Sequence, residues 1–196
     1  MTRIIAGAIG SLQLKPAAKA TRPTSDRVKE SLFAKLEAMD VIEGARVLDL
    51  FAGTGALGLE SASRGAAAVE LVERDRNAFA LLEQNVKSSL SSFEKQGISN
   101  KIQAHNLAAQ RYLKSATAEF DLVFVDPPYD FPNAELEQLL ISIAEILSEE
   151  GLVVVERSSR SEQLEIEALK LQSSKNYGDT AAVSYTHLTL PTIYSV

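Results

Sequence analysis

The residues best suited to chemistry begin with the stretch DLFAGTGALG, in which three glycines have the G-x-G-x-x-G spacing of a nucleotide-binding loop. These glycines are Gly53, Gly55 and Gly58, and they follow an apolar run that predicts a buried strand. Glycine at such positions lets the backbone approach a ligand closely. The spacing therefore predicts a bound nucleoside, with a purely structural strand, turn and helix as the alternative.

Two carboxylates decide which nucleoside the loop suits. Glu73 lies 20 residues after Gly53, where a dinucleotide-binding protein holds the ribose. However, Asp49 stands four residues before the first glycine, where its charge would repel a pyrophosphate. S-adenosyl-L-methionine has no phosphate and carries an ammonium and a sulfonium group, so a carboxylate attracts it. We therefore expect S-adenosylmethionine as the cofactor, with a dinucleotide as the alternative.

A second group of candidates is the stretch DLVFVDPPYD, in which a predicted strand ends at Asp126. One interpretation is a turn that ends the strand, since proline cannot continue a central strand. In the other, the Asp126 carboxylate and the Pro127 carbonyl accept hydrogen bonds from one exocyclic amine. Pro128 stiffens this segment, and Tyr129 offers a ring on which an extruded base can stack. These four residues are the predicted catalytic set.

Weaker candidates surround the predicted cofactor site. Asn106 follows a strand and could bind adenine or cap the next helix. Phe51 and Leu107 could enclose the adenine or belong to the core, and Asn85 is expected on a helix surface. The predicted cofactor-binding residues are Asp49, Phe51, Gly53, Thr54, Gly55, Glu73, Arg74, Asn106 and Leu107.

These candidates need a scaffold, and the pattern of apolar residues predicts one. Buried strands are expected over residues 45–51, 68–73, 101–105, 120–126 and 151–156. Helices are expected between them, over residues 56–64, 76–90 and 134–147. A final antiparallel pair is expected over residues 167–175 and 180–185. Alternating strands and helices predict an α/β fold whose parallel sheet binds ligands at the carboxyl ends of its strands.

The start of the chain differs from this scaffold in charge and in pattern. Apolar runs within the first 15 residues predict a small hairpin, and a helix is expected over residues 21–39. Residues 1–29 carry six basic and one acidic side chains, and the whole chain has a net charge of −6, so the remainder sums to −11. A basic arm on an acidic body predicts a polyanionic partner, with a solvated surface segment as the alternative.

Composition argues against several other classes of protein. With no cysteine and two histidines, the chain offers no disulfide framework, no thiolate site and no histidine cluster, so no metal is expected. No run approaches the roughly 18 apolar residues of a membrane span. The start has no secretory signal. We therefore expect a cytoplasmic protein.

Four segments together resemble the RsmD family, whose members methylate the exocyclic N2 amine of one guanine in 16S rRNA of the small ribosomal subunit. These segments are TRPTSDRVKESLF, VLDLFAGTGALGLESASRGA, VELVERD and FDLVFVDPPY. The resemblance implies a class I SAM-dependent methyltransferase (Rossmann-like) fold. It implies a seven-stranded, mostly parallel sheet with helices on both faces and a terminal antiparallel hairpin. A small N-terminal hairpin and a helix precede this sheet.

The resemblance also divides the chain and implies its partner. It implies an N-terminal appendage over residues 1–40, a methyltransferase domain over residues 41–185 and an atypical tail over residues 186–196. The expected substrate is 16S rRNA in small-subunit particles or their assembly intermediates, bound by a monomer without a membrane or a metal. The family is richer in arginine and lysine near Ile9 and Ser11. The residues expected to contact RNA are Arg3, Lys15, Arg22, Thr24 and Arg27.

Two other functions remain open on the sequence. A DNA adenine-N6 methyltransferase uses the same Asp-Pro-Pro-Tyr chemistry, although it normally needs a separate target-recognition region. A catalytically idle module could keep the fold and bind the cofactor and a nucleic acid without turnover. The expected reaction is direct in-line methyl transfer to the amine, without a covalent enzyme intermediate.

Overall fold

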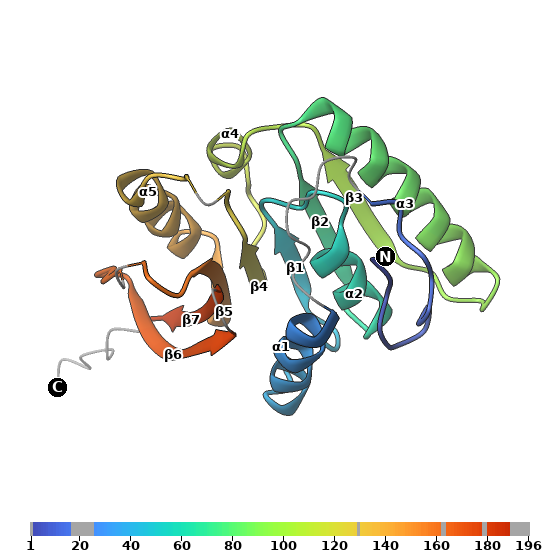
Figure 1. Ribbon diagram of the computed structural model, residues 1–196, viewed down its shortest axis with the longest axis horizontal. Coiled ribbons are helices and arrows are strands. Elements are labelled where there is room, and N and C mark those ends of the chain that lie inside the picture. Colours follow the sequence, from blue (N-terminus) through green and yellow to red (C-terminus); the bar gives the residue numbers. More distant parts are fainter. Residues whose placement is uncertain (1, 17–25, 129, 162–163, 178–179, 189–196) are drawn as a thin grey trace, which may run out of the picture.

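A seven-stranded sheet organises the protein (Figure 1). The structure is a computed structural model that describes residues 2–16, 26–128, 130–161, 164–177 and 180–188. The strands are β1 (Arg46–Asp49), β2 (Ala68–Val72), β3 (Lys101–His105), β4 (Phe120–Val125), β5 (Leu147–Ser158), β6 (Leu169–Tyr177) and β7 (Thr180–His187). Their order across the sheet is β3-β2-β1-β4-β5-β7-β6, and β7 runs antiparallel to both of its neighbours. This confirms the predicted fold class.

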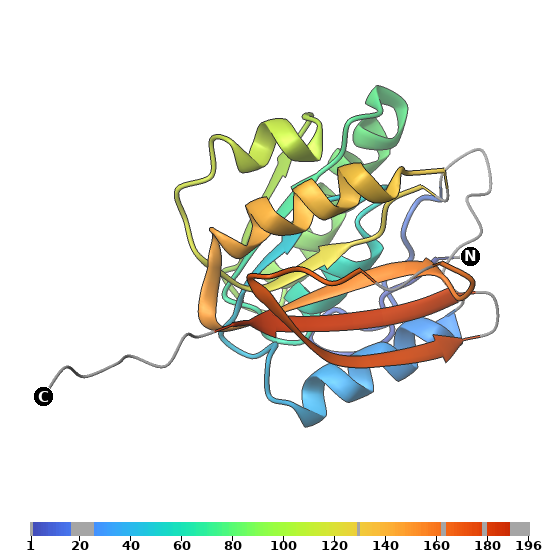
Figure 2. The ribbon, with the colours of Figure 1, turned by 90° about the vertical axis from the view of Figure 1, so that its left-hand side faces the viewer.

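Helices cover both faces of the sheet, as expected for parallel strands (Figure 2). They are α1 (Asp26–Ala38), α2 (Ala56–Ser63), α3 (Arg76–Glu94), α4 (Ala109–Leu113) and α5 (Asn133–Ala144). Apolar residues of α1, α2 and α3 pack in one buried cluster, and those of α4 and α5 pack in a second. The sheet is therefore the middle of three layers.

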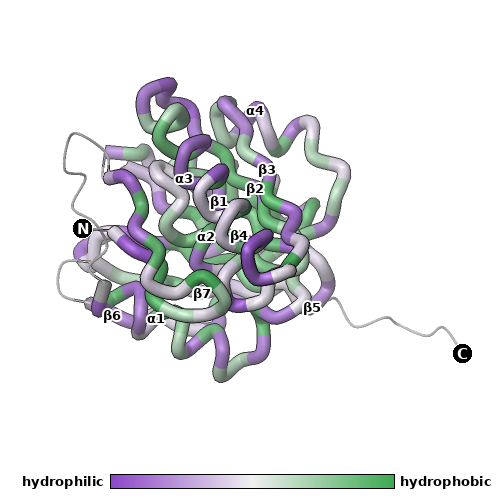
Figure 3. Tube along the Cα trace, turned by 90° about the vertical axis from the view of Figure 1, so that its right-hand side faces the viewer, coloured by the Kyte–Doolittle hydropathy of each residue, from purple (hydrophilic) through white to green (hydrophobic). Residues whose placement is uncertain are grey.

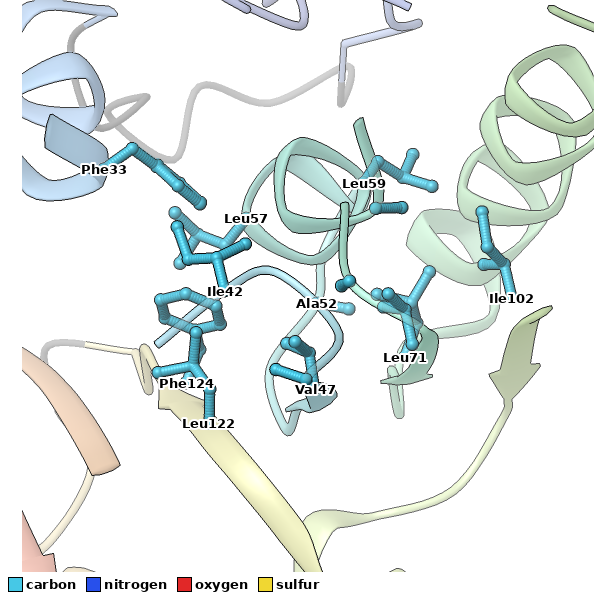
Figure 4. Close-up of a cluster of buried hydrophobic side chains, with 14 of the residues drawn as sticks. Phe33, Ile42, Val47, Ala52, Leu57, Leu59, Leu71, Ile102, Leu122 and Phe124 are labelled. Carbon is cyan, nitrogen blue, oxygen red and sulfur yellow. The ribbon is translucent and has the colours of Figure 1, made fainter. Parts of the chain in front are cut away.

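Alternation along each strand divides the core between these clusters. Val47 of β1 and Phe124 of β4 join the cluster of α1, α2 and α3, which Figure 4 shows. Leu48 and Val125 point to the other face and join α4 and α5. Because both faces of the sheet are buried, the central strands are nearly continuous apolar runs. Figure 3 shows them as hydrophobic segments at the centre of the molecule.

The parallel register aligns the carboxyl ends of β1, β4 and β5. Asp49 is paired with Phe124 between β1 and β4, and Val125 is paired with Val155 between β4 and β5. Strand β1 lies between β2 and β4, so the strand order reverses at this point. In open α/β sheets, ligands bind where the order reverses. The fold thus places the glycine loop and the end of β4 at one edge.

The third glycine of the loop has a packing role. At Gly58, an added Cβ would lie 2.2 Å from a methyl carbon of Leu71 and 3.1 Å from one of Val69. Real Cβ atoms do not approach this closely, so glycine lets α2 lie directly against β2. The start of α2, and with it the loop, is fixed by this contact.

The predicted N-terminal hairpin forms without regular strands. The Ile4 N–H donates to the Leu12 carbonyl at 3.0 Å, and the Leu14 N–H donates to the Thr2 carbonyl at 2.9 Å. Ile4 and Leu14 are buried, together with Ile9. These three side chains join the buried cluster of α1, α2 and α3, so apolar packing ties the segment to the domain.

A buried carboxylate holds the N-terminal segment in place. Glu60 of α2 is fully buried and accepts the backbone N–H groups of Ile5, at 2.7 Å, and Ala6, at 3.1 Å. It also forms salt bridges with Lys29 of α1 at 3.6 Å and with Arg64 at 2.8 Å. A buried charge is tolerated when it is paired and hydrogen-bonded. Glu60 therefore joins the N-terminal segment, α1 and α2.

Some boundaries differ from the sequence expectations. The helix expected over residues 134–147 ends at Ala144, and β5 already begins at Leu147. The short helix α4 was not predicted, and α3 continues four residues beyond its expected end at 90, to Glu94. Strand β7 continues through His187, past the domain boundary expected at residue 185. None of the helices in the described part of the chain has the length and apolarity that crossing a membrane requires.

Replacing Glu60 with glutamine should destabilise the fold, because the buried salt bridges of this carboxylate with Lys29 and Arg64 would be lost. We expect the free energy of unfolding to fall by about 3 kcal/mol and the thermal midpoint by roughly 6–12 °C. The control is Glu37→Gln, since Glu37 also pairs with Arg64, at 2.8 Å, but is 51% exposed. It should cost less than about 0.5 kcal/mol. Equal losses in a thermal melt would contradict the role given to Glu60.

Candidate active site

The backbone N–H groups of the three loop glycines donate hydrogen bonds to acceptors within the protein. Gly53 and Gly55 have φ values of 55° and 88°, in the left-handed region that favours glycine. The Gly53 N–H donates to Glu73 Oε2 at 2.9 Å, and the Gly55 N–H donates to the Ala52 carbonyl at 2.6 Å. The Gly58 N–H donates to a further carboxylate, that of Asp49, at 3.2 Å.

This pattern differs from that of a phosphate-binding loop. Such a loop leaves its N–H groups pointing at the ligand, where they bind anionic oxygens. Here two of the three glycine N–H groups point at carboxylates, so the loop presents negative charge. The geometry opposes a pyrophosphate and suits a ligand with positive charge and hydrogen-bond donors.

Asp49 is the most deeply buried carboxylate of the site, with 1% of its surface exposed. Burial raises the pKa of its carboxyl from 3.8 to about 7, although the N–H groups of Gly58 and Phe51 lower it and the charge of Glu73 raises it. Its Oδ1 atom is buried and has no hydrogen-bond partner among the described residues. An unpaired buried acceptor is costly, so this atom is suited to receive a donor from a ligand.

Glu73 and Asn106 fix the end of β2. The Glu73 carboxylate accepts the N–H of Asp75 at 2.6 Å as well as that of Gly53. The Asn106 side-chain amide donates to the carbonyls of Glu73, at 2.8 Å, and Arg74, at 3.2 Å. The helix-cap interpretation of Asn106 is therefore wrong, because α4 has Ala108 at its N-cap and no side-chain cap. Contact of Asn106 and Arg74 with a cofactor stays a prediction.

Phe51 and Leu107, which were expected either to enclose the adenine or to belong to the core, lie at the edge of the core. Each is half-buried and packs against the cluster formed by α4 and α5. The ring of Phe51 meets that of Phe131 edge to face, with centroids 5.4 Å apart. They belong to the core margin, and their contact with adenine stays a prediction.

Asn85 is buried, so its predicted place on a helix surface is wrong. With 2% of its surface exposed, it lies on the apolar face of α3. Its amide donates to the carbonyls of Thr54, at 2.9 Å, and Lys15, at 3.2 Å, and its oxygen accepts the Lys15 N–H at 2.8 Å. Asn85 therefore links the N-terminal arm to the glycine loop. Its position between Leu82 and Val86 in the helical repeat was the available signal.

Asp126 directly follows β4 and lines a cavity at the carboxyl edge of the sheet. Burial raises the pKa of Asp126 well above its ordinary value, and the charges of Glu156 and Asp49 raise it further. The lining residues are Asp126, Pro127, Pro128, Phe131, Glu156, Arg157, Ser158 and Ser161. An acidic cavity beside the glycine loop suits a group that donates hydrogen bonds.

Two residues of this cavity, Glu156 and Arg157, were not predicted. Arg157 donates from Nη2 to Asn133 Oδ1 at 2.6 Å, and its Nη1 is buried without a partner among the described residues. Both residues lie beyond Val155, which is paired with Val125 at the end of β4. Locating them required the strand order, which the sequence pattern alone does not provide.

The structure describes three of the five residues predicted to contact RNA. Arg3 and Arg27 are exposed, and the side chain of Lys15 is exposed and donates to Gln84 Oε1 at 2.6 Å. Lys15 stands next to the glycine loop through Asn85. The remaining predicted residues Arg22, Thr24 and Tyr129 lie outside the described residues.

Comparison with known proteins agrees with this geometry. The family model described as Conserved hypothetical protein 95 matches residues 2–186. A Haemophilus influenzae protein named ribosomal RNA small subunit methyltransferase D is 34% identical, over 93% of this chain and 91% of its own length. The Escherichia coli protein of the same name is 37% identical, over 79% of this chain and 73% of its own length.

A solved structure supports the same conclusion. The Escherichia coli protein yhhF superposes with a TM-score of 0.79 at 33% sequence identity, covering 94% of this chain and 97% of that one. Sequence and structure thus agree over nearly the whole chain. The chain belongs to the Conserved hypothetical protein 95 family, which is the RsmD family of methyltransferases.

Proposed function

We propose that this protein binds S-adenosylmethionine and transfers its methyl group to the N2 amine of a guanine in 16S rRNA. The observation that carries this proposal is the position of Asp126 beside Asp49. Asp49 is paired with Phe124 in the parallel register, and Asp126 follows two residues later on the same face. An acceptor for an amine therefore adjoins the site for a methyl donor. The names of the Haemophilus and Escherichia relatives support rRNA as the substrate class.

The residues around the glycine loop suit this cofactor. The unpaired Oδ1 of Asp49 can accept a hydrogen bond from the cofactor's ammonium group. Glu73 retains acceptor capacity for the ribose hydroxyls, because a carboxylate accepts about four hydrogen bonds. When bound, S-adenosylmethionine supplies a methyl group already activated by a positively charged sulfur. The protein then needs to bind and orient the two partners, which is where most of the rate enhancement arises.

Asp126 and the Pro127 carbonyl orient the amine. When both accept its N–H groups, the nitrogen lone pair leaves conjugation with the ring and points at the methyl carbon. As nitrogen bonds to this carbon, the carbon–sulfur bond breaks and its electrons go to sulfur. The nitrogen then loses one proton, and Asp126 can accept it, because burial raises the pKa of this carboxyl. Tyr129 is expected to stack on the extruded base.

The basic arm supports RNA as the partner at this edge. Lys15 adjoins the glycine loop, Arg27 is exposed near the start of α1, and Arg22 and Thr24 fall between them in sequence. The body of the protein is acidic, so phosphate contacts must be few. Specificity then has to come from the shape of a folded RNA or particle that presents an accessible guanine.

The cofactor site can be tested with Asp49→Asn. Because the folded state raises the pKa of Asp49 to about 7, its ionisation destabilises the cofactor-free protein increasingly as the pH rises from about 4 to 7. The variant should therefore melt about 10 °C higher than the parent at pH 8 and almost equally at pH 4. It should bind S-adenosylmethionine about 10-fold more weakly by calorimetry, because the substitution removes a charge-assisted hydrogen bond.

The matched control for this test is Asp40→Asn, which changes an exposed aspartate outside the loop. It should alter neither the melting temperature nor the affinity. S-adenosylmethionine should raise the melting temperature of the parent, whereas NAD should not. Tighter binding of NAD than of S-adenosylmethionine would refute the proposed cofactor.

The acceptor site can be tested with Asp126→Ala. We expect the methylation rate to fall by about 1,000-fold, since the group that orients the amine is removed. Cofactor affinity should change less than about 2-fold, because Asp126 addresses the amine and not the donor. Asp130→Ala, at an exposed position in the same loop, is the control and should keep its activity. If Asp126→Ala kept the activity of the parent, Asp-Pro-Pro-Tyr would have only the structural role of a turn that ends the strand.

The substrate class can be tested in a side-by-side assay with small-subunit particles, protein-free 16S rRNA and duplex DNA. Particles should be methylated fastest, and Arg22→Ala and Arg27→Ala should slow this reaction without weakening cofactor binding. For each phosphate that a variant no longer neutralises, the salt slope of RNA binding should fall by about 0.7–0.9. Lys101→Ala, at the amino end of β3, is the control. A preference for duplex DNA would favour the adenine-N6 alternative, and turnover on none of the substrates would favour the idle binding module.

A further inference from the structure

Three carboxylate residues stand in a row at the carboxyl edge of the sheet. Asp49 ends β1, Asp126 follows β4, and Glu156 lies on β5, one residue beyond Val155, the partner of Val125. Strands β1, β4 and β5 are consecutive neighbours. The row therefore runs from the glycine loop, past the predicted amine site, to the far side of the cavity.

All three residues belong to the same face of the sheet. Phe124 and Val154 pack in the cluster of α1, α2 and α3, and residues two positions further along a strand point the same way. Asp126 and Glu156 hold these positions, and both line the cavity described above. Asp49 is paired with Phe124 on the other side of β4. Neighbouring strands lie about 4.8 Å apart, so the side chains of Asp126 and Glu156, at matching positions, are close enough to bind one planar ligand together.

A row of acceptors suits a ligand with a matching row of donors, because each carboxylate can accept several hydrogen bonds. The charges of Glu156 and Asp49 both raise the pKa of Asp126, because each repels its ionised carboxylate. A ligand that donates to Asp126 and Glu156 at once relieves this repulsion. Ionised carboxylates accept hydrogen bonds and donate none, so the pair selects for donors at both positions.

Guanine has this arrangement of donors on one edge. Its N2 amine carries two hydrogens, and the adjacent N1 carries a third. Adenine has an amine at C6, but the adjacent N1 is an acceptor with a lone pair. A carboxylate that faces N1 therefore binds guanine and repels adenine.

We propose that Glu156 is a specificity-determining residue, whose carboxylate accepts the N1–H of the target guanine while Asp126 accepts its N2 amine. This inference rests on the proposed function, because it names how that site selects its base. Glu156 contacts the base edge away from the reacting methyl group. It therefore determines which base is methylated and leaves the chemistry of transfer to Asp126.

The test uses 2-aminopurine, which keeps the N2 amine but has a lone pair at N1. Small-subunit particles are reconstituted on 16S rRNA with guanine or 2-aminopurine at the mapped target position, and initial methylation rates are compared. The parent protein should prefer guanine by more than about 100-fold, because sites built to bind an N–H strongly reject an analogue that lacks it. In Glu156→Gln, the side-chain amide can donate to N1 of 2-aminopurine. The preference should then fall below about 10-fold.

Two further variants separate specificity from structure. Glu156→Asp keeps an acceptor and should retain a preference for guanine, with a lower rate. Glu150→Gln removes the same charge at an exposed position of the same strand and should behave like the parent. S-adenosylmethionine affinity of every variant should match that of the parent in calorimetry, because Glu156 is the carboxylate furthest from the glycine loop.

Each outcome decides the matter. A guanine preference that is large in the parent and small in Glu156→Gln supports the inference. Equal rates of the parent on guanine and 2-aminopurine would overturn it, whether or not any variant folds. The same preference in Glu156→Gln as in the parent would overturn it too. If the parent methylated no guanine particle, the proposed function itself would fail, and the inference with it.

Discussion

The hydrogen bonds that the glycine loop makes within the protein govern the rest of the site. Gly53 donates its N–H to Glu73, and Gly58 donates its N–H to Asp49. The same backbone in a phosphate-binding protein would keep these donors for its ligand. Because two carboxylates accept them, these N–H groups have partners before any ligand arrives, and the charge that the loop presents is negative. One motif thus serves ligands of opposite charge, and the acceptors beside it decide which.

The parallel register extends this row of carboxylates along the sheet, whereas residues 1–29, the N-terminal arm, carry a net positive charge. Asp126 and Glu156 follow Asp49 across β4 and β5, and the arm is fastened to α2 by the buried Glu60. Asn85 attaches the arm at Lys15 to the loop at Thr54. The acidic sheet edge is suited to cations and amines, and the basic side chains of the arm are suited to phosphates.

Much of this arrangement could be predicted from the sequence, since the central strands are nearly continuous apolar runs and each long helix has one apolar face. Asp126 was found because it ends such a run, and Asp49 because it stands four residues before the first glycine of the loop. Leu147 was placed in a helix because its apolar side chain fits a helical face as well as the start of a strand. Helix α4 is too short to show a period.

The residues missed by sequence reasoning depend on contacts between distant segments. Asn85 is polar, and its backbone partner at Lys15 lies 70 residues earlier, so its burial has no local signal beyond its place in the helical repeat. In the sequence, Glu156 is only a polar residue at the end of a predicted strand. The strand order is what places it beside Asp126. Sheet order is a property of the whole chain, and a pattern within one element does not contain it.

The packing of Gly58 has a consequence for any survey of tolerated substitutions along this loop. An added Cβ would meet the side chains of β2 at Gly58, whereas at Gly53 it would meet no atom within 4 Å. Only the left-handed backbone restricts Gly53, and asparagine or aspartate can adopt that conformation. Mutational intolerance should therefore be strictest at the glycine that lies against the sheet. Along this motif, how poorly a glycine tolerates substitution therefore does not indicate how near it lies to the ligand.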